Sequence, residues 1–266
     1  MATKNASYET LLVTVQDGVR TIAFNRPDEM NVVDERVTSE LQAELRAIGK
    51  DKATRCVVLT GVGKAFCAGQ DLKSATSREG PFDFTDALRR RYNPVVLGFR
   101  SLELPVIAAI NGVAAGAGWS LALACDLRIA SASAKFVGAF SRIGLVPDSG
   151  MTWILTQLVG TAKALELAWL GEPLTADAAL QLGLVNRVVP AEELEGAARQ
   201  WAVQLAKGPT KGLGLTKRAV YTGLGRDLES QLEYEALLQG VAGRTTDYAE
   251  GVKAFIEKRA PEFKGE

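Results

Sequence analysis

Short β-rich runs alternate with helical patterns along most of this chain, and this alternation constrains the fold more than any other feature. The runs Leu11–Gln16 and Val19–Phe24 are joined by Asp17-Gly18, a pair that favours the positive φ of a tight hairpin turn. From Asp34, which is placed to cap a helix, apolar residues recur at helical spacing. A β-branched run follows at Cys56–Thr60. This order predicts an α/β fold.

The same order recurs in the middle of the chain. Val106–Ile110 is expected to be a strand, and the small-residue segment from Gly116 to Ala124 a helix packed close to its neighbours. Leu127–Ala130 follows as another strand. The last expected strand is Val185–Val189.

Helical patterns replace the strands after about Pro190, with breaks near Gly208-Pro209 and Gly223–Gly225. We therefore expect an α/β core over residues 1–190 and a helical region over residues 191–266. Because no low-complexity linker separates the two, the helical region is expected to pack on the core or on a partner subunit.

The charge balance and the cysteines limit the partners and the compartment of the chain. Lys plus Arg and Asp plus Glu number 31 each, so no basic field attracts nucleic acid or an anionic membrane. The polar stretch 1–10 lacks the apolar run of a signal peptide, and no window is long enough to span a membrane. Three widely spaced cysteines without a Cys-x-x-Cys pair indicate a reduced, cytoplasmic protein.

Several common cofactor and metal sites are not expected from the residue types. The sequence has no histidine, which removes the commonest acid–base side chain and the commonest zinc ligand, so we predict no metal site. Gly61-Val62-Gly63-Lys64 is followed by Ala65 rather than by Ser or Thr and is not a P-loop. The glycines at 112, 116 and 118 do not have dinucleotide-binding spacing, so a nicotinamide enzyme is not favoured either.

Two backbone segments offer N–H groups for an anionic oxygen. Gly116-Ala117-Gly118 is the start of an expected helix directly after a strand, where α/β proteins bind ligands. In the segment from Phe66 to Leu72, an apolar strand gives way to a glycine turn, and the N–H of Gln70 is placed to point into the same crevice. Two converging N–H donors would form an oxyanion hole, whereas each segment taken alone favours a structural turn.

A carboxylate lies in the loop from Gly144 to Gly150, directly after Pro147. Asp148 has two interpretations. It caps the expected helix Met151–Leu158, or it is a base whose pKa is raised by apolar neighbours such as Trp119, Phe140 or Trp153.

Four segments of the chain, in this order, resemble the enoyl-CoA hydratase/isomerase (crotonase) superfamily: Phe24–Pro27, Ala65–Leu72, Pro105–Asp126 and Gly144–Gly150. The strings FCAGQDL and GLVPDSG, with FIEKRAPEF near the end, are most similar to the 1,2-epoxyphenylacetyl-CoA isomerase subgroup. The resemblance implies a spiral of repeated ββα units followed by a C-terminal helical oligomerisation region. It also implies a homotrimer or a hexamer, as a dimer of trimers.

The resemblance also implies the roles of particular residues in binding an acyl-coenzyme A thioester, with coenzyme A entering as part of the substrate and no cofactor bound permanently. The N–H groups of Gln70 and Ala117 would form the oxyanion hole for the thioester carbonyl, and Asp148 would be the acid–base residue. Lys258 would reach the coenzyme of a neighbouring subunit. The full set of expected substrate-binding residues is Ala68, Gly69, Gln70, Asp71, Leu72, Lys73, Gly116, Ala117, Ser120, Phe140 and Lys258.

The chain departs from the hydratase pattern at the acids. Hydratases of this superfamily use two glutamates to hold and activate water, and matching the motifs puts Ser120 and Phe140 at those positions. The remaining carboxylate, Asp148, suffices for an isomerase that stabilises a thioester enolate, with 1,2-epoxyphenylacetyl-CoA or a Δ3/Δ2-enoyl-CoA as substrate. Three alternatives stay open: an enoyl-CoA hydratase, an aryl-CoA dehalogenase in which Asp148 attacks an aromatic carbon, and a non-catalytic binding protein of the same fold.

Overall fold

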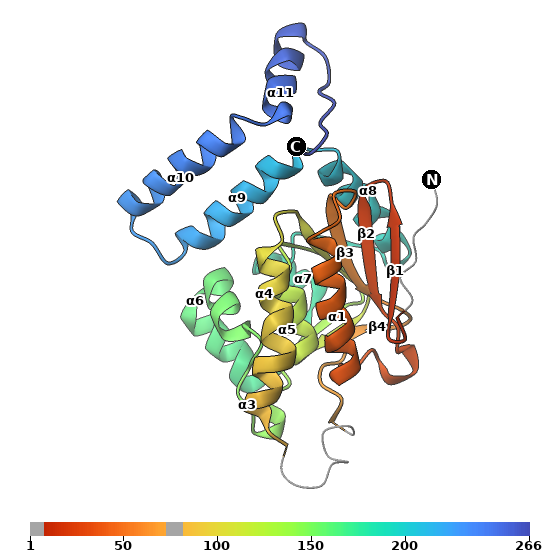
Figure 1. The fold of residues 1–266 in the computed structure, drawn as a ribbon. Coiled ribbons are helices and arrows are strands. Elements are labelled where there is room, and N and C mark those ends of the chain that lie inside the picture. The colour runs from red at the N-terminus through yellow and green to blue at the C-terminus, as the bar shows by residue number, and fades with distance from the viewer. Residues whose placement is uncertain (1–7, 73–81) are drawn as a thin grey trace.

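The computed structural model describes residues 8–72 and 82–266, which form two sheets with helices around them (Figure 1). The larger sheet has the strand order β1-β2-β3-β5-β7-β10 and the smaller one the order β4-β6-β8-β9. The strands are β1 (Leu11–Gln16), β2 (Val19–Phe24), β3 (Cys56–Gly61), β4 (Ala65–Cys67), β5 (Val106–Ile110), β6 (Val113–Ala115), β7 (Leu127–Ser131), β8 (Lys135–Val137), β9 (Leu174–Thr175) and β10 (Arg187–Val189).

The predicted hairpin and most of the predicted strands are confirmed. Strands β1 and β2 pair antiparallel from Leu11 opposite Phe24, and both turn residues, Asp17 and Gly18, have positive φ. From β2 onward the pairs of the larger sheet are parallel. Strand β5 is buried at every position, which explains its unbroken apolar sequence.

The strands enter the two sheets in a repeating order. Strands β3, β5 and β7 join the larger sheet, and the strand that follows each of them, β4, β6 and β8, joins the smaller sheet in parallel pairs. A helix follows β6 and another follows β8. This arrangement confirms the expected spiral of ββα units and places the ends of β4 and β6 next to each other.

The helices that cover the sheets have the expected amphipathic or apolar sequences. In α1 the Oδ1 of Asp34 accepts a hydrogen bond from the N–H of Val37 at 2.9 Å, so the predicted cap is confirmed. Helix α5 is buried at all its positions, which its small residues allow. The described helices of the α/β part are α1 (Glu35–Ile48), α3 (Phe84–Ala87), the π-helical turn η2 (Leu88–Tyr92), α4 (Asn93–Ser101), α5 (Ala117–Ala124), α6 (Met151–Leu170) and α7 (Ala176–Gln181), with the 3₁₀ turns η1 (Pro27–Glu29) and η3 (Ser141–Ile143).

Helix α6 extends beyond the predicted Met151–Leu158. Gly160 has φ 74° and ψ 166°, which is not helical, so α6 consists of two helical pieces that meet at this residue. The predicted helix corresponds to the first piece. The second piece was not predicted, although Thr161, a residue type that commonly caps a helix, directly follows the glycine.

The C-terminal part is helical from η4 (Ala191–Glu193) onward, through α8 (Leu194–Ala206), α9 (Thr210–Gly223), α10 (Leu228–Ala242) and α11 (Thr246–Glu257). Helix α8 packs on the larger sheet, where its residues Ala198 and Ala202 share a buried cluster with Val58 and Ile107. Helix α9 is joined to the α/β part by an ion pair of 2.8 Å between Lys217 and Asp126. The predicted helical region thus includes one helix that belongs to the core packing.

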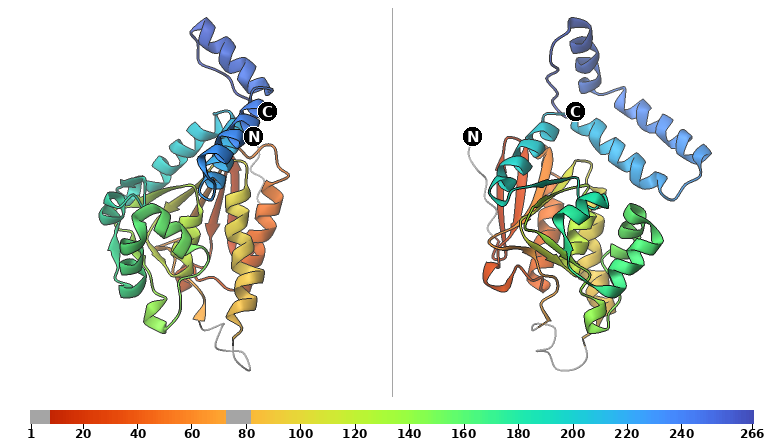
Figure 2. Two further views of the ribbon diagram at one scale, coloured as in Figure 1. Left: turned by 90° about the vertical axis from the view of Figure 1, so that its left-hand side faces the viewer. Right: turned by 180° about the vertical axis from the view of Figure 1, so that it is seen from behind.

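Helices α10 and α11 extend away from the sheets (Figures 1 and 2). They carry large apolar side chains that are exposed in this single chain: Leu228, Leu232, Leu237, Val241, Tyr248, Val252, Phe255 and Ile256. Across the described ranges, no helix is long and apolar enough to cross a membrane.

Candidate active site

Asp148 lies in the loop between η3 and α6, and it does not cap α6. The N-cap position is Gly150, and no side chain accepts a hydrogen bond from the first turn of that helix. The helix-cap interpretation of Asp148 is therefore wrong. Ser149, with φ 53°, is in the left-handed region and turns the chain between Asp148 and the helix.

The Asp148 carboxyl group is half-buried, and burial raises its pKa above the ordinary value. The hydroxyl of Ser149 donates a hydrogen bond to Oδ1 of Asp148 at 2.8 Å, which acts in the opposite direction and lowers the pKa. Of the predicted apolar neighbours, Trp119 and Phe140 are buried, whereas Trp153 is 49% exposed. A carboxylate with a raised pKa is a stronger base near neutral pH than an exposed aspartate.

Ser120 connects this loop to the start of α5. Its buried hydroxyl donates a hydrogen bond to the backbone oxygen of Asp148 at 3.0 Å and lies 3.3 Å from the backbone oxygen of Gly116. The contact brings the Asp148 loop to the first turn of α5. Ser120 itself is occupied with backbone oxygens and presents no carboxylate to water.

The first turn of α5 begins at Ala117, directly after β6. Gly116 precedes it with φ 50°, and no side chain caps the helix. The helix lies directly on β4, because a Cβ added to Gly118 would be 2.2 Å from the backbone oxygen of Cys67. The ring of Phe140 is in van der Waals distance of Gly116, because its Cζ lies 4.0 Å from the position that a Cβ on Gly116 would take. Phe140 therefore forms an apolar wall beside the helix start.

The second donor segment follows β4. Gln70 forms an isolated parallel bridge with Val33, in which the N–H of Val33 donates to the oxygen of Gly69 at 2.7 Å and the N–H of Asp71 donates to the oxygen of Val33 at 2.9 Å. In such a bridge the N–H of the middle residue points to the opposite side. The N–H of Gln70 therefore points away from Val33.

The two predicted donor segments lie against each other. Gly69 has φ 99°, and a Cβ built on it would lie 2.8 Å from the oxygen of Ala115 and 3.5 Å from the N–H nitrogen of Ala117. In residues 8–72 and 82–266, neither Gln70 nor Ala117 donates its backbone N–H to another protein atom. The arrangement leaves two neighbouring N–H groups at the first turn of α5, and the backbone of the loop that carries Asp148 is bonded to the same turn. Such an arrangement can hold an oxyanion while a proton is moved nearby.

The other predicted binding residues differ in their exposure and position. Ala68 is half-buried with its N–H bonded to the oxygen of Met30, and Leu72 is exposed. Lys73 lies outside the described residues. Lys258 is the C-cap residue of α11, which lies at the opposite end of the molecule from α3 in Figure 1.

Sequence reasoning missed two residues that contact the bridge between Val33 and Gln70 or the residues next to it. The hydroxyl of buried Tyr92 donates to the oxygen of Val33 at 3.3 Å, and burial first, with the nearby Cys67 and Asp148 after it, raises its pKa. The guanidinium of Arg26 pairs with Asp71 at 3.2 Å. Arg26 was part of a motif that carried the resemblance, but nothing in the sequence indicated its partner 45 residues later.

Comparison with known proteins gives the family. The family model described as enoyl-CoA hydratase/isomerase matches residues 14–266. The chain is 45% identical over 259 residues to the 1,2-epoxyphenylacetyl-CoA isomerase of Escherichia coli, with 97% of this chain and 99% of the relative covered. The chain belongs to the enoyl-CoA hydratase/isomerase family. It is therefore an enzyme of the crotonase superfamily, as the sequence motifs predicted.

Two further relatives of this enoyl-CoA hydratase/isomerase family carry hydratase names. A probable enoyl-CoA hydratase of Rhodobacter capsulatus is 44% identical, with 97% of this chain and 99% of the relative covered. The crystal structure of a putative enoyl-CoA hydratase from Streptomyces coelicolor A3(2) has a TM-score of 0.93 at 35% identity and covers 100% of this chain and 98% of that chain. The family and the crotonase fold are thus shown, whereas the names of the relatives are divided between isomerase and hydratase.

Proposed function

We propose that this protein is an acyl-CoA isomerase in which Asp148 carries the proton and the N–H groups of Gln70 and Ala117 stabilise the thioester enolate. The observation that carries the proposal is the hydrogen bond of 3.0 Å between Ser120 and the backbone of Asp148. This bond supports the proposal because it joins the backbone of the Asp148 loop to the first turn of α5, and Ser120 stands where the family motif would otherwise supply a water-holding glutamate. Phe140, the other such position, is an apolar ring.

In this proposal one carboxylate serves both half-reactions. Asp148 removes a proton from the carbon next to the thioester, the electron pair moves onto the carbonyl oxygen, and the same acid returns the proton to another carbon, so no atom is gained or lost. Two N–H donors at the oxygen are worth on the order of 3 kcal/mol each, and a positioned base adds roughly 10²–10⁴-fold. Together they are sufficient for a proton shift.

The substrate that we favour is 1,2-epoxyphenylacetyl-CoA, with a Δ3/Δ2-enoyl-CoA as the second candidate. The 45% identity to an enzyme of that name, and the FCAGQDL and GLVPDSG strings, support the first. For that substrate the same donors and acid would assist opening of the arene epoxide to a seven-membered oxepin ring.

A screen of acyl-CoA thioesters tests the reaction class. We expect the protein to convert the phenylacetyl-CoA epoxide or a 3-enoyl-CoA to a product of unchanged mass. Absorbance and mass spectrometry measure this conversion. Because Ser120 and Phe140 replace the two glutamates, we expect crotonyl-CoA to gain water slowly or not at all. Rapid hydration of crotonyl-CoA would instead favour the hydratase alternative. Micromolar binding of acyl-CoA without any turnover would favour the non-catalytic binding protein.

The dehalogenase alternative has a separate signature. An aspartate that attacks an aromatic carbon takes oxygen from solvent when the ester is hydrolysed, so oxygen-18 water would label Asp148 during turnover. An isomerase leaves the carboxylate unlabelled. We expect no label, and mass spectrometry of the peptide that contains Asp148 measures it.

We also propose that the protein assembles as a trimer or as a hexamer of two trimers. The support is the exposed apolar side chains on α10 and α11, among them Phe255 and Ile256 at 85% and 72% exposed. Light scattering at working concentration is expected to give the mass of three or six chains. A sharp monomer would contradict the proposal and would also remove the suggested role of Lys258 at a neighbour's coenzyme.

A further inference from the structure

We propose that Arg26 is a positioning residue that holds the N–H of Gln70 in place for the developing enolate oxygen. This inference rests on the proposed function, because it names a residue outside the site that supports one of its two donors. Arg26 follows β2 and lies 44 positions before Gln70 in the sequence. Its contribution depends on contacts that the fold creates between two distant loops.

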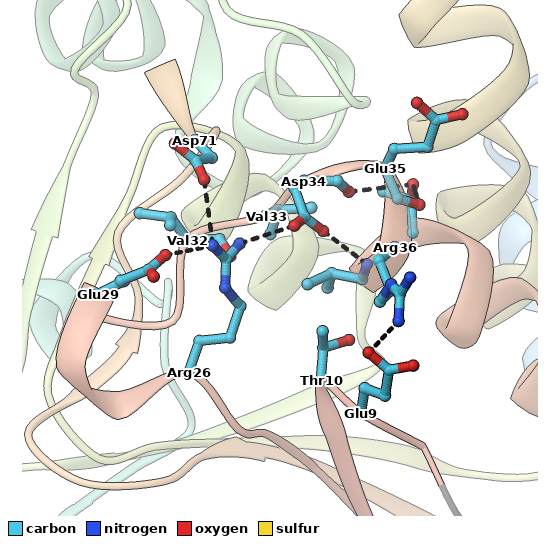
Figure 3. Close-up of polar contacts among 12 residues, drawn as sticks. Glu9, Thr10, Arg26, Glu29, Val32, Val33, Asp34, Glu35, Arg36 and Asp71 are labelled. Atoms are coloured by element: carbon cyan, nitrogen blue, oxygen red, sulfur yellow. Dashed lines mark hydrogen bonds and ion pairs between the residues drawn. The ribbon is translucent and has the colours of Figure 1, made fainter. Parts of the chain in front are cut away.

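The Arg26 side chain is only 17% exposed, and its guanidinium joins the two loops that form the bridge between Val33 and Gln70 (Figure 3). On one side it donates to the backbone oxygen of Val32 at 3.1 Å and pairs with Asp34 at 3.1 Å. On the other side it pairs with Asp71 at 3.2 Å. A third carboxylate, Glu29, also contacts it. The guanidinium thus contacts the residues that flank the bridge on both strands.

The bridge needs such support because it is short. It consists of the two hydrogen bonds that Val33 makes with Gly69 and Asp71, outside any named strand. The direction of the Gln70 N–H depends on how residues 69–71 lie against residues 32–34. A planar guanidinium that contacts both loops fixes this relation better than a single hydrogen bond does.

The backbone of Arg26 is held in place by Asn31. Its backbone N–H donates to Oδ1 of Asn31 at 2.9 Å, and the amide of this buried side chain donates to the oxygens of Val62 and Ala65 at 2.9 and 2.8 Å. The support therefore runs from β4 through Asn31 and Arg26 to the donor segment.

The charges make the side chain hard to replace. Arg26 pairs with Glu29, Asp34 and Asp71. Removing the guanidinium takes away the one positive charge that these three ion pairs share and leaves the carboxylates of Asp34 and Asp71, one on each loop, without that attraction. We expect the segment that carries Gln70 to move away, while the first turn of α5, which carries the Ala117 N–H, stays in place.

The test replaces Arg26 with Met, which has a similar reach and no charge, and with Lys, which keeps the charge but lacks the planar fork. Arg36→Met is the matched control, because Arg36 is 53% exposed and pairs with Glu9 in the same region without a contact to residues 69–71 (Figure 3). We expect R26M to lower kcat by roughly 10- to 100-fold, less than complete loss of an oxyanion donor. The KM for acyl-CoA should stay within about threefold because the rest of the binding surface is unchanged. The kcat of R26K should lie between those of R26M and the unaltered protein. The kcat of R36M should equal that of the unaltered protein.

A spectroscopic readout separates positioning from a merely structural role. An unsaturated aromatic acyl-CoA with a para-amino donor absorbs at longer wavelength when its thioester carbonyl is polarised by hydrogen bonds. We expect this red shift in the unaltered protein and in R36M, and a clearly smaller shift in R26M at saturating ligand. If R26M binds the ligand with the full red shift and keeps its kcat, or loses only thermal stability, the inference is wrong. Should R26M not fold, R26K provides the same comparison with the charge of the side chain kept.

Failure of the proposed function would look different. In that case the unaltered protein would isomerise no acyl-CoA, yet the red shift would still report whether Arg26 affects polarisation of the carbonyl. Turnover by the unaltered protein with an unaffected R26M variant would contradict the role of Arg26 alone.

Discussion

Replacing Asp148 with Asn is expected to lower kcat by roughly 10²–10⁴-fold, because the amide keeps the size of the side chain and cannot accept a proton. The hydrogen bond from Ser149 can be retained by the amide oxygen. Since Gln70 and Ala117 are untouched, the affinity for acyl-CoA should stay near its starting value. Steady-state kinetics with calorimetry of acyl-CoA binding measures both quantities.

The same substitution should not destabilise the fold. Burial raises the pKa of Asp148 above its ordinary value of 3.8, so the folded state disfavours the ionised form. The contribution of this group to stability is therefore greatest below pH 3.8 and is lost as pH rises through the folded pKa. At neutral pH the Asn variant is expected to melt at the same temperature as the unaltered protein or at a higher one. An unchanged kcat, or a marked loss of stability, would contradict the assignment.

Replacing Gly69 with Ala is expected to lower kcat by roughly 10²–10³-fold, the effect of losing an oxyanion donor. The new Cβ would meet the backbone oxygen of Ala115 at 2.8 Å, which is too close for a real contact, and φ at this position is 99°. The donor segment and the start of α5 must then move apart. Steady-state kinetics measures the loss of kcat. A smaller red shift of a bound aromatic acyl-CoA would show that the two donor segments no longer polarise its carbonyl together.

The control for this experiment is Gly183→Ala. Gly183 also has a positive φ, 72°, but nothing lies within 4 Å of the position of its Cβ. Alanine there introduces the strain of a positive φ, about 1 kcal/mol, without a clash. We expect a small loss of stability and an unchanged kcat. Equal losses of kcat in the two variants would mean that backbone strain, rather than the separation of the donors, is responsible.

The elements with strong local signals were predictable from the sequence. The hairpin of β1 and β2 depends on Asp17-Gly18 and on alternating residues, and both act within a few positions. The cap of α1 by Asp34 and the unbroken apolar strand β5 are likewise local. The short strand β6 was missed because its three small residues, Val113–Ala115, have no period of their own and are held by pairing with β4 and β8.

The candidate site was predictable as a set of segments, but its geometry was not. Glycines at 69 and 116 marked places where the backbone turns, and the motifs identified the family, yet spacing along the chain does not say which turns meet. The approach of Gly69 to Ala117 and the bond from Ser120 to Asp148 depend on pairs of residues 48 and 28 positions apart. The role of Arg26 was hidden for the same reason.

The wrong helix-cap interpretation of Asp148 shows that residue types alone do not determine the conformation of a loop. Aspartate shortly before a helix commonly caps it, and the residue types alone allowed this. The left-handed turn at Ser149 and Gly150 instead separates Asp148 from the helix. Within residues 8–72 and 82–266, the half-buried Asp148 forms no ion pair and caps no helix. Burying such a carboxylate is costly for stability, and groups of this kind are concentrated at functional sites.

Hydrogen exchange at the carbon next to the thioester tests the central claim most directly. In deuterium oxide, the unaltered protein is expected to exchange this proton of a bound acyl-CoA substrate for deuterium, as measured by mass spectrometry, and the rate should rise with pH as Asp148 ionises. Asp148→Asn should bind the same ligand and exchange the proton roughly 10²–10⁴-fold more slowly. Exchange that proceeds at the same rate in both proteins would contradict the assignment of Asp148 as the proton carrier.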